Sequence, residues 1–350
     1  MINRENYLLV REFLDYRATV KQRDQKTVNS YWHSMKHFLQ WLDKRHVSEA
    51  EKVKPTFPEY ILHARNYQHT SHIPQNKKDI EPLSPSELER KVLHARMFLE
   101  WVKLSKGIKI SLAYIETLEI RRSARAQSKL TKREYWRLSD VEKIAALKPQ
   151  SLAEKRDIAA TCFIFLSGAR VGAFVTLPFA AVDIEKRRII QSPEIGVRTK
   201  NHKAAVTFLL PIESLMKPVR EWHEYIATHG GRDLLWYPAF KAGGFFNGEK
   251  WSLEFERGGI EGDNHGRQTT FKAGLKVLCD RAGVDYLSPH KLRHGHGVYG
   301  VKNAKDISEL KAISQNLMHE NIGITDGIYG KLADDDLSEI ISKFGKGKKS

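Results

Sequence analysis

Hydrophobic residues recur at three- and four-residue spacing through the first 120 residues, a pattern that predicts helices. Thr27 is expected to cap one helix, whose apolar positions run from Val28 to Leu42. A second helix is expected from the capping box Ser84-Pro85-Ser86-Glu87, with proline at its first position, and Gly107 is expected to end it. Residues 1–120 are therefore predicted to form a small all-helical domain.

The second half mixes helical patterns with short β patterns. The capping box Ser139-Asp140-Val141-Glu142 is expected to open it. Residues 187–192 and 204–210 are rich in β-branched and aromatic residues, and they flank a basic segment, which predicts a β-hairpin with a basic tip. The glycine-rich stretch 230–266 is expected to be an irregular insertion without a readable role. Helices are predicted at 154–167, 212–228, 270–282, 288–302, 306–318 and 335–344. The predicted fold is mainly α, with a small β-sheet or hairpin in a mixed α+β second domain.

Composition narrows the class of protein. The chain has 350 residues, 41% of them hydrophobic, enough apolar material for a sizeable core. The longest apolar stretch lies near Ile158–Ala169, too short to span a bilayer, and the N-terminus carries no apolar signal region. Cys162 and Cys279 are the only cysteines, and both lie in apolar helical contexts. These features favour a reduced cytoplasmic protein without a zinc site or a membrane partner.

Charge suggests a partner. Lysine and arginine number 58 against 42 acidic residues, a formal charge of +16, and the isoelectric point is near 9.6. Such a basic balance is typical of proteins that bind nucleic acid. The expected domains are 1–120, a basic linker at 121–134, 135–345, and a basic tail at 346–350. The basic residues expected to follow a phosphate backbone are, in the linker, Arg121, Arg122, Arg125, Lys129, Lys132 and Arg133, together with Lys203 further along the chain.

Common catalytic motifs are missing, and other polar groups take their place. No P-loop, zincin, nucleophile-elbow or dinucleotide motif occurs, and the consecutive acids Asp334–Asp336 suit a helix start better than a metal site. Four groups in the second half stand out instead. They are Arg170 in a glycine-flanked turn, the hairpin lysines Lys200 and Lys203, His290 with Arg293 three residues apart, and His319 followed by Tyr329.

In this order, these groups resemble the catalytic motifs of the tyrosine recombinases, the phage integrase family. The strings HKLRH and LMHENIGITDGIYGKL are similar to the family's most recognisable stretch. The resemblance covers roughly residues 135–345, and the helical first domain resembles the family's core-binding domain. The chain begins at that region, so the expected type has two domains and no arm-binding domain. The matching catalytic positions are Arg170, Lys200, His290, Arg293, His319 and Tyr329.

The resemblance implies a mechanism that needs neither metal nor ATP. Arg170 and Arg293 would clamp the phosphate, and Tyr329 would attack phosphorus to give a 3′-phosphotyrosine. Lys200 would protonate the leaving 5′-oxygen, with Lys203 as a competing candidate. His290 would assist proton transfer, and His319 would hydrogen-bond the phosphate. Strand exchange in pairs implies a tetramer on two DNA sites.

Some positions depart from the family pattern, and two other functions share its features. Ala173 stands where the family often has Glu, and Gly295 and Gly297 stand where larger residues are common. A type IB topoisomerase-like enzyme would use the same phosphoryl chemistry as a monomer. A DNA-binding regulator would lack the complete residue set. The stripe Leu337, Ile340, Ile341 and Phe344 favours docking on a neighbouring protomer, with docking in cis nearly as well supported.

Overall fold

The computed structural model describes residues 2–52, 59–65, 83–120, 134–230, 234–240, 245–246, 251–252, 264–321, 323 and 325. The chain divides into two units, Met1–Thr131 and Lys132–Ser350. The basic linker residues, Tyr329 and the expected helix at 335–344 lie outside the described residues.

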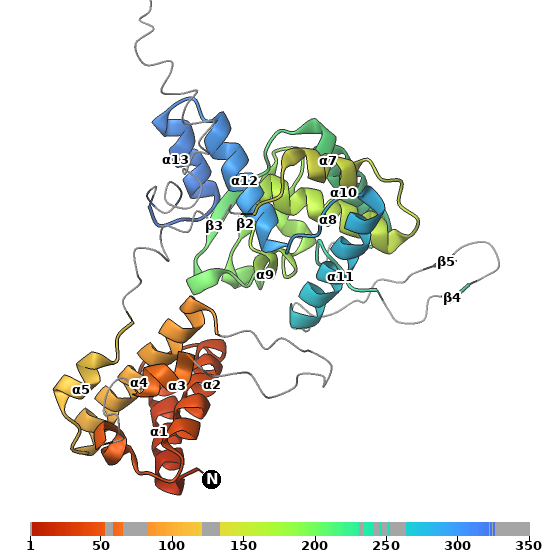
Figure 1. Ribbon diagram of the computed structural model, residues 1–350. Coiled ribbons are helices and arrows are strands. Elements are labelled where there is room, and N and C mark those ends of the chain that lie inside the picture. Colours follow the sequence, from red (N-terminus) through yellow and green to blue (C-terminus); the bar gives the residue numbers. More distant parts are fainter. Residues whose placement is uncertain are drawn as a thin grey trace, which may run out of the picture. The chain divides into compact units, whose positions relative to one another are not determined.

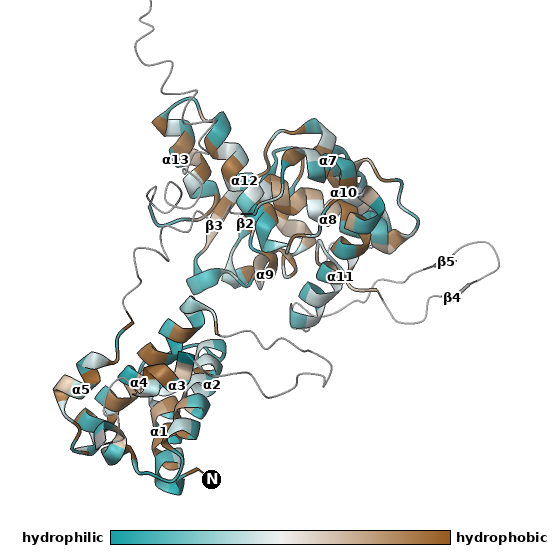
Figure 2. Ribbon diagram, viewed as in Figure 1, coloured by the Kyte–Doolittle hydropathy of each residue, from teal (hydrophilic) through white to brown (hydrophobic). Residues whose placement is uncertain are grey.

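The described part of the first unit is helical (Figure 1). Its core is aromatic, with Phe13, Phe38 and Phe98 almost completely buried. Hydrophobic residues of the helix α4 (Pro85–Lys106) contribute to this core (Figure 2). The helices are α1 (Arg4–Thr19), α2 (Gln25–Leu42), the 3-10 helix η1 (Val47–Lys52), α3 (Glu59–Arg65), α4 (Pro85–Lys106) and α5 (Leu112–Thr117).

The two predicted caps in this unit had different outcomes. The prediction for α4 is confirmed: Ser84 accepts from the amide of Glu87, Pro85 opens the helix, and Gly107 ends it at φ +63°. The predicted cap at Thr27 is wrong. Asp24 caps α2, its carboxylate accepting from the amide of Thr27 at 2.7 Å, so the helix begins one turn earlier.

In the second unit, the buried helix α8 (Leu152–Ser167) lies at the centre and contacts α7, α10, α11 and α12 (Figure 1). Every residue of α8 from Arg156 to Ser167 is buried, in agreement with the prediction for 154–167. The helices around it are α7 (Leu138–Ala145), α9 (Val171–Phe174), the 3-10 helix η2 (Phe179–Ala181), α10 (Glu213–His229), α11 (Asn264–Ala282), α12 (His290–Asn303) and α13 (Ile307–Asn316).

The predicted capping box at Ser139 is also wrong. The helix α7 begins at Leu138, because the carbonyl of Arg137 already accepts from the amides of Asp140 and Val141. Ser139 therefore lies inside the helix. Glu142 does not serve as a cap here; its carboxylate accepts from Ser214 of α10 at 2.8 Å.

The predicted hairpin is present within a three-stranded antiparallel sheet, in the order β1-β2-β3. The strands are β1 (Val182–Asp183), β2 (Arg188–Gln191) and β3 (Ala205–Phe208), with Ile190 opposite Val206. The sequence did not indicate β1, which is only two residues long. Between β2 and β3 lie two 3-10 helices, η3 (Pro193–Ile195) and η4 (Lys200–His202).

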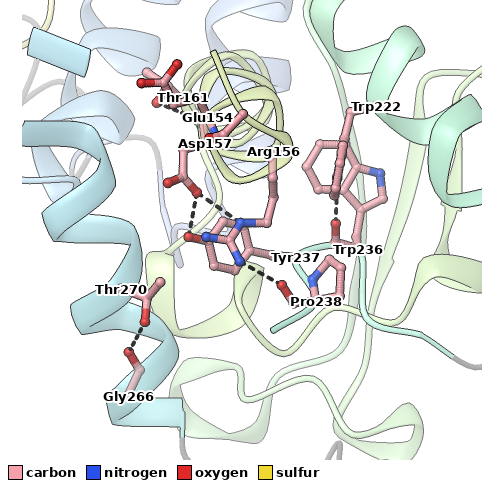
Figure 3. Close-up of polar contacts among 11 residues, drawn as sticks. Glu154, Arg156, Asp157, Thr161, Trp222, Trp236, Tyr237, Pro238, Gly266 and Thr270 are labelled. Carbon is pink, nitrogen blue, oxygen red and sulfur yellow. Dashed lines mark hydrogen bonds and ion pairs between the residues drawn. The ribbon is translucent and has the colours of Figure 1, made fainter. Parts of the chain in front are cut away.

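Part of the stretch expected to be an irregular insertion belongs to the core. Residues 234–237 are buried, and the amide of Trp236 donates to the carbonyl of Leu177 at 2.8 Å. Figure 3 shows how side chains fix this segment: Arg156 donates to the carbonyl of Pro238, and Tyr237 donates to the carboxylate of Asp157 at 2.7 Å. Further along, β4 (Phe245–Phe246) pairs with β5 (Trp251–Ser252). The backbone of 234–237 is irregular, as expected, apart from one isolated bridge between Leu235 and Pro178, but these residues belong to the core and are not an insertion outside it.

Candidate active site

A glycine turn at the end of α8 presents Arg170. Gly168 adopts the left-handed conformation, φ +62°, and its amide closes the helix on the carbonyl of Ile164. A Cβ at this position would lie 2.7 Å from Cδ2 of His296, so the turn needs glycine for space as well as for conformation. The chain then enters α9 with Arg170 at its N-cap, half-buried.

Arg293 is the most deeply buried of the predicted catalytic residues that the structure describes, with 3% of its surface exposed. Its Nη1 donates to the carbonyl of Gly168 at 2.6 Å, and its Nη2 donates to the carbonyl of Leu317 at 2.5 Å. Nη2 also lies 3.1 Å from Nε2 of His319. The guanidinium thus joins α12, the glycine turn and the segment after α13 in one arrangement.

His290 lies one turn before Arg293 on α12. Burial and then the charges of Arg293 and Arg170 lower the pKa of His290 below its usual range. Its ring meets that of His294 edge to face, with centroids 4.8 Å apart. A histidine held neutral at this position can accept a proton during a reaction.

His319 lies in the same group, half-buried. Burial, Arg293 and Arg170 lower the pKa of His319 to about 4, so the ring is neutral at physiological pH. Its Nε2 faces Nη2 of Arg293, a group that can only donate, so Nε2 must be the acceptor. This contact differs from the expected hydrogen bond to phosphate, because the ring proton is then on Nδ1.

The hairpin carries both lysines to the edge of this group. The amide of Arg198 donates to Thr176 Oγ1 at 3.0 Å, which fixes the connection beside α9. Lys203 pairs with Glu320 at 2.8 Å, and this contact, together with the charge of Lys200, lowers the pKa of Glu320. Both lysines are exposed and lie near the residue that follows His319.

Two residues that the sequence did not indicate hold these parts together. The Asn316 side chain pairs with the edge of β3: it accepts from the amide of Phe208 at 2.7 Å and donates to that residue's carbonyl at 3.0 Å. Nδ1 of His296, fully buried on α12, lies 2.8 Å from the carbonyl of Phe165. Asn and His in helices carry no pattern that indicates such long-range partners; the HxxRHxH spacing from His290 to His296 was the one available sign.

The departures from the family pattern have partly structural reasons. A Cβ on Gly295 would lie 2.3 Å from the carbonyl oxygen of Trp136, so α12 can pack this closely only with glycine there. Ala173 is buried in the core of this unit. Nothing in the structure explains Gly297.

The structure therefore brings together Arg170, His290, Arg293 and His319, with Lys200 and Lys203 at the edge. Among the residues that the structure describes, no three His, Cys, Asp or Glu side chains gather as a metal ion would need. Nor, within the same ranges, is any helix both long and apolar enough to cross a bilayer.

Comparison with known proteins identifies the class. The model of the phage integrase family matches residues 130–335, more than half of the chain. The chain therefore belongs to the phage integrase family, and the protein is a site-specific recombinase of the tyrosine class.

Individual proteins are similar to this chain at low sequence identity. The tyrosine recombinase XerC of Histophilus somni (strain 2336) is 20% identical over 339 residues, covering 96% of this chain and 97% of that protein. A Tn1549 transposon integrase in complex with a circular intermediate DNA gives a TM-score of 0.61 at 11% identity, covering 98% of this chain and all of the other. The XerH recombinase bound to a palindromic difH substrate gives 0.55 at 16% identity, covering 98% and 97%.

Proposed function

We propose that this recombinase cleaves double-stranded DNA with Tyr329 as the nucleophile. The tyrosine oxygen attacks phosphorus, a P–O bond forms to the tyrosine, and the bond to the 5′-oxygen breaks. The free 5′-hydroxyl of a partner strand then reverses the exchange and releases the tyrosine. Because each step trades one phosphate ester for another, ligation needs no ATP. Cationic side chains stabilise the charge on the phosphate, so the chemistry requires no metal.

The observation that carries the proposal is the fixed guanidinium of Arg293. It donates to the carbonyls of Gly168 and Leu317 at 2.6 Å and 2.5 Å. The charges of Arg293 and Arg170 both lower the pKa values of His290 and His319. One guanidinium oriented before the substrate arrives, with a second cation near it, is suited to the negative charge that grows on the phosphate oxygens. Such an arrangement supports cleavage more than simple DNA binding.

The remaining roles are assigned by position. Lys200 donates a proton to the leaving 5′-oxygen; Lys203, which is paired with Glu320, holds the hairpin tip. His290, neutral and beside both arginines, accepts the proton of the tyrosine hydroxyl. His319 orients Arg293.

A bridging sulfur substrate separates the two lysines. In DNA with sulfur in place of the leaving 5′-oxygen, the leaving group has a much lower pKa and needs no protonation. We expect K200A to be slow on normal DNA and restored on the sulfur substrate. K203A, the matched control, should be affected equally on both. If the sulfur substrate restores cleavage by K203A and not by K200A, Lys203 is the proton donor and the assignment of Lys200 is wrong.

We propose that the protein acts as a tetramer on two DNA sites, at the nucleoid in the cytoplasm. The linker residues Arg121, Arg122, Arg125, Lys129, Lys132 and Arg133 would contact phosphates. The apolar stripe within 335–345 would dock on a neighbouring protomer. Deletion of 335–350 should then impair synapsis more than binding to one site, measured by gel shift with one and two labelled sites. Normal tetramers from the truncated protein would contradict docking in trans.

The decisive experiment for the function traps the intermediate. A footprint on DNA flanking the gene gives the site, and a nicked version of that site lets the cleaved strand diffuse away. We expect a covalent protein–DNA adduct that forms equally with and without a chelator. Relaxation of supercoiled DNA by a monomer, without strand exchange, would favour the topoisomerase-like alternative. Site binding without any adduct would favour the regulator.

A further inference from the structure

A line of hydroxyl groups leads away from His319 on the side opposite Arg293. Nδ1 of His319 lies 2.8 Å from Oγ1 of Thr325. Thr325 Oγ1 donates to Ser314 Oγ at 2.9 Å, and Ser314 Oγ donates to the carbonyl of Asn321 at 3.4 Å. Thr325 is fully buried, and Ser314 has only 3% of its surface exposed.

The direction of these bonds follows from the groups at each end. A guanidinium only donates, so Nε2 of His319 accepts from Arg293 and the proton of the neutral ring is on Nδ1. That proton points at Thr325, whose oxygen accepts it and donates onward to Ser314. The line ends at a backbone carbonyl, which only accepts, so every bond runs the same way.

The opposite tautomer does not fit the same contacts. A proton on Nε2 would face an N–H of Arg293, donor against donor. The bare Nδ1 would then need a proton from Thr325, which would break the bond from Thr325 to Ser314. Ring orientation and proton position are therefore determined together.

We propose that Thr325 and Ser314 are positioning residues that hold His319 as the Nδ1-protonated tautomer, so that Nε2 accepts from Arg293 and fixes the guanidinium toward the scissile phosphate. Because both residues are buried, we expect neither to contact DNA. The inference rests on the proposed function only in taking a scissile phosphate as the group that Arg293 faces. The tautomer and the hydroxyl contacts that hold it are properties of the protein without DNA.

The first test is spectroscopic and independent of activity. In the full chain with ¹⁵N-labelled histidine, NMR should find the His319 proton on Nδ1 in the wild type. T325V removes the acceptor and should redistribute the proton between the two nitrogens, while T325S should restore Nδ1. T270V, at an exposed threonine of α11 whose hydroxyl donates to the carbonyl of Gly266 on the same helix, is the matched control. A wild-type proton on Nε2, or an unchanged ring in T325V, overturns the proposal.

The second test links the tautomer to the reaction. Single-turnover adduct formation should fall about 10-fold or more in T325V, the size typical of losing such a supporting contact, with the Kd for DNA unchanged. S314A should give a smaller loss in the same direction, and T325S should recover the wild-type rate. If T325V does not fold, the adduct-formation rates of S314A and T325S are compared with that of the wild type instead. A redistributed tautomer with an unchanged rate contradicts the positioning role. Absence of adduct in the wild type would defeat the proposed function while leaving the NMR result standing.

Discussion

Nη2 of Arg293 and Nε2 of His319 lie 3.1 Å apart, a contact between α12 and the segment that follows α13. The two residues are 26 positions apart in the chain. Their contact requires a neutral histidine, because a protonated ring would place two positive donors against each other. Burial and the neighbouring arginines supply that neutral state, since they lower the pKa of His319 to about 4.

The first prediction concerns the shape of the Arg293 side chain. R293K keeps the charge but cannot reach Gly168, Leu317 and His319 at once, because a lysine ammonium lacks the planar fork. We expect adduct formation to fall about 10²–10³-fold, the loss typical of removing one oriented donor. R281K is the matched control: Arg281 bonds Glu154 and the carbonyl of Lys148 within the same unit. Near-wild-type cleavage by R293K would contradict a positioned clamp.

The second prediction concerns acid stability. Burial lowers the pKa of His296 to about 4, below its usual 6.5, so the unfolded chain binds more protons between these values. The contribution is complete above pH 6.5 and is lost as the pH falls toward 4. Between pH 7 and pH 5 this one group should cost about 2 kcal/mol of unfolding free energy. Urea denaturation of H296Q should show a weaker pH dependence by about that amount, and the exposed H229Q serves as control. Equal slopes for wild type and H296Q would refute the assignment.

The third prediction concerns the packing of α12. In G295A the new methyl would meet the Trp136 carbonyl oxygen and the ring of Phe165, neither of which can move freely. The expected loss is about 1–3 kcal/mol of unfolding free energy. G172A, whose Cβ would meet its nearest atom at an ordinary 3.7 Å, should be neutral or slightly stabilised. Equal stability of the two variants, measured by urea denaturation, would disprove the close approach.

The fourth prediction concerns the basic linker. Each phosphate contact releases counterions, so the logarithm of the binding constant should fall with the logarithm of salt by about 0.9 per contact. Replacing Arg121, Arg122 and Arg125 by alanine should flatten this slope by up to about 2.7 and weaken all DNA sequences alike. Fluorescence anisotropy over a salt series measures both quantities. An unchanged slope would show that these arginines do not contact DNA.

Sequence alone predicted the helical first unit, the buried helix before Arg170 and the lysine hairpin, because each depends on local periodicity. The four residues that the structure brings together were proposed because their order along the chain resembles the catalytic motifs of the phage integrase family. Helix starts were less accurate. Asp24 and Thr27 are both good caps, and only the backbone geometry decides which one the helix uses.

The supporting contacts could not be predicted because they join distant segments. Asn316 completes the edge of β3 across 108 positions, and Thr325 reaches His319 through a side-chain direction that no spacing encodes. The burial of residues 234–237 was not predicted, because they lie in a glycine-rich stretch without periodic apolar positions. The reason that Gly295 departs from the family pattern is also a long-range contact, because a Cβ there would lie 2.3 Å from the carbonyl oxygen of Trp136.

The central claim is tested most directly by Tyr329. Y329F keeps the aromatic ring and removes only the hydroxyl, so it should bind the nicked DNA site with wild-type affinity and form no covalent adduct. Y299F is the matched control, because Tyr299 lies on α12 itself, and it should form the adduct normally. Mass spectrometry of the wild-type adduct should find the 3′-phosphate on Tyr329. An adduct formed by Y329F, mapped to another residue, would contradict the account.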